Sequence, residues 1–214
     1  MKYVEQEKIL NHHKEILGND LGKLYYSLKN TLFSLQIKFQ MYMSLYGSKE
    51  TVDILNEFQG AFFGEIQDIL LDDIILHINK LFSYSGKRDN KVLSFFCLPD
   101  LISDIVIKEK IIEILKKYNQ NYLTTKTRRN KYIAHFDYQF FVNKKEIDIS
   151  IKMDDIKEII DSMWSIIECI EDHYFNTCIE RYIYSPSMSI EVLLKKMKCF
   201  NYVGMKKIFE IANN

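Results

Sequence analysis

An arginine and a histidine six positions apart, Arg129 and His135, are the residues of this chain best suited to chemistry on a phosphodiester. Arginine keeps its charge in proteins and presents planar donors that match phosphate oxygens, whereas histidine exchanges a proton near neutral pH. Together they could cleave RNA without a metal ion. Such a pair also arises by chance in helical proteins, as a solvated charge and a capping imidazole, and spacing alone favours that structural interpretation.

Helix geometry leaves open which arginine would work with His135. In a regular helix, six residues advance about 9 Å and place two side chains roughly 120° apart, whereas seven residues bring them almost into line. Arg128 is therefore nearer the stripe of His135, and Arg129 converges on it if the helix bends or ends between them. Arg129 is the arginine directly followed by a polar residue, Asn130.

The expected reaction is in-line attack of the RNA 2′-hydroxyl on the neighbouring phosphorus, giving a 2′,3′-cyclic phosphate and a 5′-hydroxyl. The histidine would act as general base or acid, and the arginine would stabilise the negative charge of the transition state. One histidine cannot easily be acid and base at once, so a twofold arrangement that joins two copies of the motif would complete the site. The hypothesis therefore includes a homodimer.

Charge is balanced over the whole chain, with 29 basic and 29 acidic residues, but it is unevenly distributed. Between Glu50 and Asn79 there are seven acidic residues and no lysine or arginine, whereas between Lys108 and Lys131 eight basic residues stand against two acidic ones. The basic run ends at the motif and predicts RNA contacts from Lys126, Arg128 and Lys131, although a solvated helix face would give the same pattern.

Other titratable residues are weaker candidates. Asp72 and Asp73 could orient an arginine across a helix bundle, although two acids at the start of an apolar run are more often solvated. Surface or capping positions are expected for the remaining histidines, which are His12, His13, His77 and His173.

The composition favours long helices. Only two prolines and seven glycines interrupt 214 residues, and 47% of the residues are hydrophobic. Apolar residues recur at spacings of three and four, which predicts an all-α bundle of long antiparallel helices. We expect a helical domain over residues 1–184 and a helical appendage over 185–214, which could be a helix pair, a partner surface or a weak nucleic-acid contact.

Individual helices are expected from these stripes and from local start and stop signals. The expected ranges are Val4–Leu17, Leu21–Tyr46, Ser48 to Leu81, Val92–Leu98 with an end before Pro99, Asp100 to Phe136 with a bend near residues 119–125, and a helix capped by Asp155 and Glu158 that ends near Phe175. An extended loop or small hairpin is expected over Tyr138–Lys152. Trp164 is expected to be a packing anchor.

Several classes of site find no support in the sequence. The four cysteines have no paired spacing, so neither a zinc site nor a disulfide framework is indicated. No glycine-rich phosphate loop or two-carboxylate metal pattern is present, and we expect no metal and no cofactor. The chain shows no signal peptide and no apolar run long enough to span a membrane, which predicts a cytoplasmic protein without a membrane partner.

The motif and the order of the helices resemble those of the HEPN superfamily, in its abortive-infection (Abi U-like) branch. The resemblance covers roughly residues 20 to 175 and rests on Arg129-Asn130, Ala134-His135 and Asp137, with Leu45-Tyr46, Phe62-Phe63, Ile66-Gln67 and Asp72 to Leu81 upstream. It implies a dimeric, metal-independent ribonuclease used in bacterial defence against phage or as a toxin. In that case Arg129 and His135 take the catalytic positions, and Asn130 is their polar companion.

Two positions depart from the pattern of the family. Lys80 stands where this branch often has an arginine, and Asp137 stands where a related toxin branch has a tyrosine that is modified. We therefore expect no modification of Tyr138. The resemblance also admits an antitoxin or regulatory protein as a partner. The main alternative is a non-catalytic, helical docking module that binds a protein or RNA, since some members of the superfamily have lost catalysis.

Overall fold

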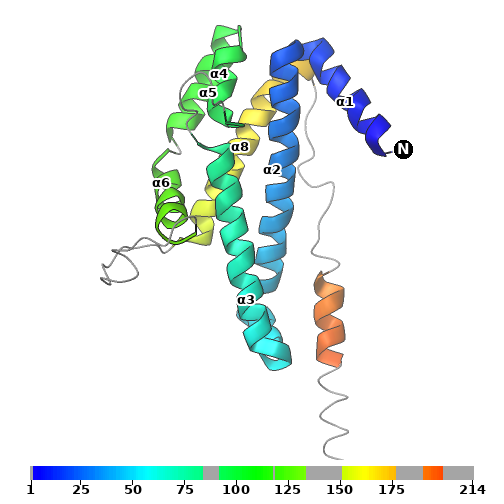
Figure 1. The fold of residues 1–214 in the computed structure, drawn as a ribbon, viewed down its shortest axis with the longest axis vertical. Coiled ribbons are helices and arrows are strands. Elements are labelled where there is room, and N and C mark those ends of the chain that lie inside the picture. Colours follow the sequence, from blue (N-terminus) through cyan, green and yellow to red (C-terminus); the bar gives the residue numbers. More distant parts are fainter. Residues whose placement is uncertain (1, 84–91, 118, 134–150, 177–189, 200–214) are drawn as a thin grey trace, which may run out of the picture. The chain divides into compact units, whose positions relative to one another are not determined.

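The computed structural model describes residues 2–83, 92–117, 119–133, 151–176 and 190–199, with the side chains of 2–4 and 119–121 left out. All the secondary structure in these ranges is helical (Figure 1), and the predicted all-α class is confirmed. The predicted hairpin between Tyr138 and Lys152 lies outside the described residues, apart from its last two positions.

The chain divides into two compact units. The first unit comprises Met1–Leu35 and Ile75–Arg181, and the second comprises Gln36–Ile74 and Tyr182–Asn214. The two longest helices, α2 (Asn19–Tyr46) and α3 (Lys49–Leu81), each contribute residues to both units. The predicted division at residue 185 stays a prediction.

The first unit is built around α8 (Met153–Ile170), whose isoleucines are buried along one face. Trp164 is fully buried and packs edge-to-face on Phe33 of α2, with the ring centroids 4.8 Å apart, so the predicted packing anchor is confirmed. The other elements of this unit are α1 (Lys2–Leu17), α4 (Leu98–Leu101), α5 (Ile105–Lys117), α6 (Asn119–Arg128) and the short turns η1 (Phe95–Cys97), η2 (Arg129–Ile133) and η3 (Glu171–Phe175).

Glycines let α1 and α2 approach closely. Gly18 separates the two helices with φ +83, a left-handed conformation that glycine adopts without strain. A Cβ at Gly22 would lie 2.7 Å from the backbone oxygen of His13, so only glycine fits at this crossing. The crossing brings His13 against the start of α2.

Two predicted helix ends are wrong. Pro99 does not follow a helix but lies in the first turn of α4, where proline is tolerated because that N–H has no partner within the helix. Helix α8 begins at Met153, and its N-cap residue Lys152 makes no side-chain capping bond. Asp154 and Asp155 therefore lie inside the first turn, where their charges suit the positive end of the helix dipole.

In the second unit, α2 turns into α3 at Gly47, as predicted. The backbone N–H of Thr51 donates to the hydroxyl of Ser48 at 3.2 Å, which caps the start of α3. Residues 190–199 form a helix whose buried apolar residues join the core of this unit, so at least this part of the tail has a packing role. That core contains Leu45, Ile54, Leu55, Ile190, Leu194 and Met197.

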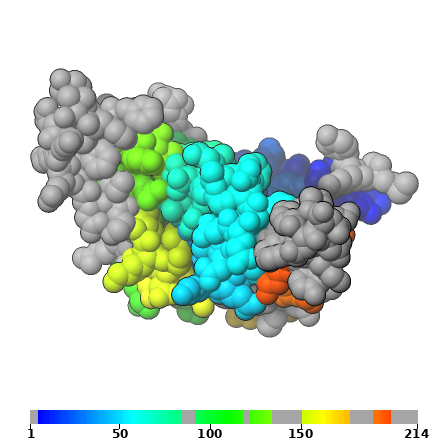
Figure 2. Space-filling model, turned by 90° about the horizontal axis from the view of Figure 1, so that it is seen from below, coloured from blue at the N-terminus to red at the C-terminus, as the bar shows by residue number. Residues whose placement is uncertain are grey.

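One face of α3 within the second unit lies at the surface (Figure 2). Phe62 and Ile69 are 56% and 61% exposed, and both follow a kink at Gln59. Seven residues return a helix almost to the same face, so these two side chains point the same way. Across the ranges that the structure describes, no helix combines the length and apolarity needed to cross a membrane.

Candidate functional site

The segment that leads into the Arg-His motif is the helix α6, whose threonine hydroxyls bond to its own backbone. In α6, the hydroxyl of Thr125 donates to the carbonyl of Tyr122 at 2.8 Å, and that of Thr127 donates to the carbonyl of Leu123 at 2.9 Å. Bonds of this kind compete with the helix ladder and bend helices. Directly after α6, residues Arg129–Ile133 form a π-helical turn.

The π turn changes the geometry assumed from the sequence. A π-helical turn closes with i→i+5 bonds, so side chains after it are rotated relative to a regular α-helix. The sequence argument that Arg128 lies nearer to the stripe of His135 than Arg129 assumed a regular α-helix. It therefore does not apply unchanged across this turn. Turns of this type are frequent at functional sites.

Arg129 and Asn130 form a hydrogen-bonded pair within the turn. The Nη1 of Arg129 donates to the Oδ1 of Asn130 at 2.6 Å, and both side chains are half-buried. A guanidinium has five N–H donors, so this bond orients the group while leaving others for a ligand. Such a fixed, partly exposed guanidinium suits a phosphate oxygen.

The neighbouring Arg128 has a different environment. Its guanidinium carbon lies 5.4 Å from the centroid of the Tyr132 ring, the geometry of a cation–π contact. Lys126 is exposed and Lys131 is half-exposed on the same segment. The two adjacent arginines are thus held by different groups, one by an amide and the other by an aromatic ring.

His135 lies outside the described residues, together with Asp137 and Tyr138. The distance from either arginine to the imidazole is therefore not part of the described geometry. The pairing of Arg129 with His135 stays a prediction.

The predicted orienting acids lie in the second unit, whereas Arg129 lies in the first. Asp73 forms an ion pair with Lys38, whose Nζ is 2.5 Å from its Oδ2, and both side chains are partly exposed. Asp72 is half-buried beside it on α3. The described contact of Asp73 is thus with a lysine of its own unit.

A buried polar cluster in the first unit was missed from the sequence. Glu171, at the end of α8, accepts hydrogen bonds from the hydroxyl of Tyr25 and from the Nζ of Lys29, the second at 2.6 Å. Burial, followed by the contact with Glu171, raises the pKa of Tyr25 well above its ordinary value. The spacing of Tyr25 and Lys29, four residues apart on one face of α2, is the only local signal of this cluster.

His13 belongs to the edge of this cluster, and its predicted surface position is wrong. Its side chain is only 7% exposed, and its ring packs edge-to-face on Tyr25 and Phe175, with centroids 5.0 and 5.5 Å away. Burial lowers the pKa of His13, and the charge of Lys29 lowers it further. His173, in contrast, lies at a helix end and is 3.4 Å from Asp104, as the prediction of a capping position implies.

Metal-ligating residues do not gather in the described ranges: no group of three or more histidine, cysteine, aspartate or glutamate side chains there could hold an ion. Cys97, Cys169 and Cys199 are free thiols. Within the described ranges, the predicted site residues that lie together are Arg129, Asn130 and the basic residues around them.

Comparison with known proteins identifies the family. The model of the HEPN AbiU2 family matches residues 18–195, which is most of the chain and includes the whole of α2, α3, α5, α6 and α8. A search of curated proteins and a search of solved structures found no match. The match extends the resemblance seen in the motif to the entire helical core, and the chain belongs to the AbiU2 family of HEPN proteins.

Proposed function

We propose that this chain is a metal-independent endoribonuclease that acts in the bacterial cytoplasm, in defence against phage or as a toxin. Arg129 and His135 are its catalytic residues, and Asn130 is their polar companion. The observation that carries the proposal is the hydrogen bond from Arg129 to Asn130 in a half-exposed π turn. Membership of a HEPN family, which is usually associated with nucleases, supports it.

In the proposed reaction, the RNA 2′-hydroxyl gives its proton to the imidazole of His135 in one protomer, and its oxygen bonds to the adjacent phosphorus. The bond from phosphorus to the 5′-oxygen breaks, and that oxygen takes a proton from a second imidazole. The guanidinium of Arg129 stabilises the negative charge on the phosphorane oxygens. The products are a 2′,3′-cyclic phosphate and a 5′-hydroxyl.

Binding of the RNA strand beside the reacting phosphate is assigned to Lys126, Arg128 and Lys131. These side chains lie on the same short segment as Arg129 and are partly or largely exposed. Their charges attract the phosphate backbone without reading its sequence. An antitoxin or regulatory protein that holds the nuclease inactive completes the proposal.

The second imidazole requires a second copy of the chain. Phe62 and Ile69 offer an exposed apolar face on α3 that supports a homodimer. The expected mass in light scattering is that of two chains. Ile69→Lys should shift it toward one chain and lower cleavage in parallel, and a monomeric parent would contradict this part of the proposal.

The test is cleavage of end-labelled RNA in excess chelator by the parent and by three variants. Arg129→Ala should lower the rate by about 10²–10³-fold, the cost of removing one donor to a developing oxyanion. His135→Ala should abolish cleavage. Arg128→Ala removes the same charge one residue away; because Arg128 is assigned to RNA binding, this variant should raise KM and keep most of the cleavage rate at saturating RNA.

The outcomes separate the alternatives. Cleavage lost in Arg129→Ala and His135→Ala but kept in Arg128→Ala supports the proposal. Loss in Arg128→Ala instead would move the catalytic role to that residue. Equal cleavage by all four proteins would reveal a contaminating nuclease, and no cleavage by any of them would favour the docking module.

A further inference from the structure

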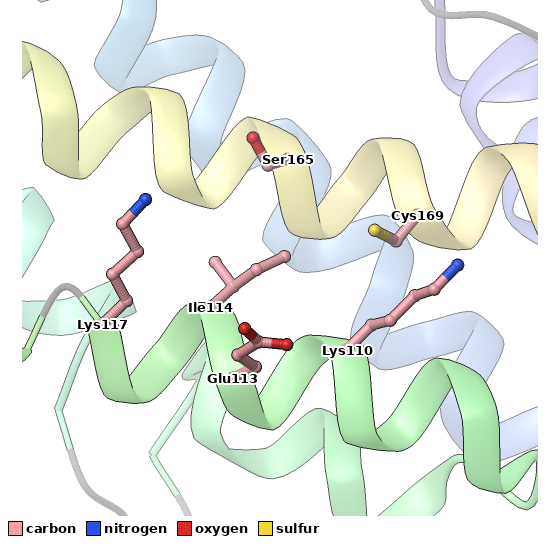
Figure 3. A pocket seen from close by; sticks show the side chains of 6 residues that line it. All are labelled: Lys110, Glu113, Ile114, Lys117, Ser165 and Cys169. Atoms are coloured by element: carbon pink, nitrogen blue, oxygen red, sulfur yellow. The ribbon is translucent and has the colours of Figure 1, made fainter.

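A pocket of about 370 Å³ opens between α5 and α8 in the first unit (Figure 3). It contains none of the residues assigned to catalysis above. Its lining combines side chains of two packed helices and consists of Lys110, Glu113, Ile114, Lys117, Ser165 and Cys169.

The two lysines stand at opposite ends of this pocket. Lys110 and Lys117 are seven residues apart on α5, which is about 10.5 Å along the helix axis and almost the same face. Figure 3 shows both side chains reaching toward α8, with Ile114 between them and the thiol of Cys169 facing the Lys110 end. Two ammonium groups thus flank one recess.

The charge of the lining is positive, with two ammonium groups against the carboxylate of Glu113. Burial raises the pKa of the Cys169 thiol; the charge of Lys110 opposes this rise, and those of Glu168 and Asp172 add to it. The thiol is therefore neutral near pH 7, which makes it a wall of the pocket and not a nucleophile.

The hydrogen-bond donors for a ligand come from the lysines. The Ser165 hydroxyl already donates to the backbone carbonyl of Asp161 at 3.0 Å. A lysine ammonium has three N–H donors on a flexible stem and binds phosphate as a point charge. A phosphate group at either end of the recess would have donors from the nearer lysine.

We propose that this pocket binds a phosphate group, supplied by the backbone of the RNA strand away from the cleaved bond. This assignment of the strand rests on the proposed function. α6 follows α5 beyond Lys117, packs on α5 and α8, and leads into the turn that carries Arg129 (Figure 1). A strand held at Arg129 can therefore continue along the basic end of α5. A free nucleotide offers the same chemistry from another source.

Cys169 provides a direct probe of occupancy. Alkylation by a maleimide at pH 8.5 is followed at each cysteine by mass spectrometry, in the presence of a 2′-O-methyl RNA 20-mer, ADP or pyrophosphate. The RNA analogue has no 2′-hydroxyl to attack and stays intact. Slower alkylation of Cys169 with RNA, and unchanged alkylation of the exposed Cys199, supports the proposal.

The arms distinguish the source of the phosphate. Protection by RNA at concentrations where ADP and pyrophosphate have no effect supports a strand-binding pocket. Protection by ADP or pyrophosphate and not by RNA keeps the phosphate site but overturns its assignment to the strand. Equal alkylation in every arm overturns the proposal.

Matched charge variants test the pocket independently of the thiol. Lys110→Gln with Lys117→Gln removes two charges from the lining, and Lys108→Gln with Lys116→Gln removes two charges from the same helix outside it. The binding constant of the labelled 2′-O-methyl RNA is measured by anisotropy over a range of salt concentrations. In the pocket variant, the slope of log binding constant against log salt concentration should be shallower by about 0.7 per lost phosphate contact.

The control variant, Lys108→Gln with Lys116→Gln, should change this slope by less than half as much as the pocket variant does. Glu113→Gln should tighten binding, and Ser165→Ala should leave it unchanged because its hydroxyl proton is already bound to a carbonyl. Equal slopes for the two double variants would show that the lysines attract RNA only through the overall charge of α5, and would overturn the proposed phosphate site. The RNA analogue cannot be cleaved, so this binding measurement does not depend on nuclease activity. A parent protein without nuclease activity would overturn the proposed function, and the binding measurement would still decide whether the pocket binds phosphate.

Discussion

Two polar sites of the first unit differ in how their charges are satisfied. At the end of α8, the carboxylate of Glu171 is 5% exposed and is hydrogen-bonded by Tyr25 and Lys29. In the η2 turn, Arg129 is half-exposed and makes one short bond to its neighbour Asn130. The first site uses its charge to join distant parts of the chain. The second holds a partly exposed charge against a neighbouring amide, which leaves donors for a phosphate ligand.

The difference predicts that the Glu171 cluster governs stability and the η2 turn governs activity. Removing one partner of a buried ion pair leaves an uncompensated charge, whereas a half-exposed group is hydrated when its partner is lost. The predictions below test this contrast from its largest expected effect to its smallest.

Glu171→Gln should lower the free energy of unfolding by about 3 kcal/mol, because Lys29 would lose its counter-charge inside the first unit. Cleavage per folded molecule should stay unchanged. Urea denaturation provides the measurement, and Glu158→Gln, which changes an exposed carboxylate on the same helix, is the control with an expected effect below about 0.5 kcal/mol. A decrease of less than about 1 kcal/mol in the free energy of unfolding of Glu171→Gln would contradict a role of the Glu171 cluster in stability.

Asn130→Ala should lower the cleavage rate about tenfold or more, since hydrogen bonds to charged groups contribute about 1.5–3 kcal/mol. The effect should fall on kcat and not on KM if Asn130 positions Arg129 for the transition state. Stability should change little. Asn130→Gln keeps the amide and should recover part of the rate; equal activity of parent and Asn130→Ala would show that the bond has no positioning role.

The stability of the fold should depend on the protonation of His13. Burial holds its pKa in the folded state below the ordinary 6.5, so the unfolded chain binds the proton more readily. The contribution of neutral His13 to the free energy of unfolding is therefore complete above pH 6.5. It is lost as the pH falls from 6.5 toward the lowered pKa of the folded state. Each pKa unit of difference corresponds to about 1.36 kcal/mol.

His13→Phe should flatten the fall in unfolding free energy between pH 7 and pH 5, because the ring contacts stay and the titrating group is gone. An identical pH dependence in the parent and in His13→Phe would show that other groups cause it.

Asp73→Asn should have the smallest effect. The ion pair of Asp73 with Lys38 is partly exposed, and such pairs contribute about 0–1 kcal/mol. Cleavage should be unchanged if this ion pair is structural. A large loss of activity without a loss of stability would support the orienting role that the sequence predicts for this residue.

The sequence predicted the helices well because their signals are local. Apolar spacing along α2 and the Gly47-Ser48 boundary depend on neighbouring residues only, and both are confirmed. The aromatic stripe of α3 was expected in the core, but its Phe58 and Phe62 are exposed. The burial of His13 was mispredicted because it depends on Gly22, which allows the helices to cross, and on Phe175, which is far along the chain. Long-range contacts of this kind leave no periodic pattern.

The candidate site was predictable in part. The sequence paired Arg129 with the polar side chain that follows it, and the structure shows a hydrogen bond between Arg129 and Asn130. The π turn was not predictable, because hydroxyl-to-carbonyl bonds like those of Thr125 and Thr127 also occur within the regular helix α8, so the residue types before the turn do not distinguish it. The partnership with His135 and the roles assigned to these residues stay predictions.

The most direct test of the central claim uses one RNA in two forms, in excess chelator. Once the cleaved bond is mapped, the same RNA is made with a 2′-O-methyl group on the nucleotide before that bond, and the products of the parent protein are identified by mass spectrometry. The account predicts cleavage of the unmodified RNA to a 2′,3′-cyclic phosphate and a 5′-hydroxyl, and no cleavage at the modified bond. Cleavage of both forms at that bond, or products that carry a 5′-phosphate, would contradict attack by the 2′-hydroxyl.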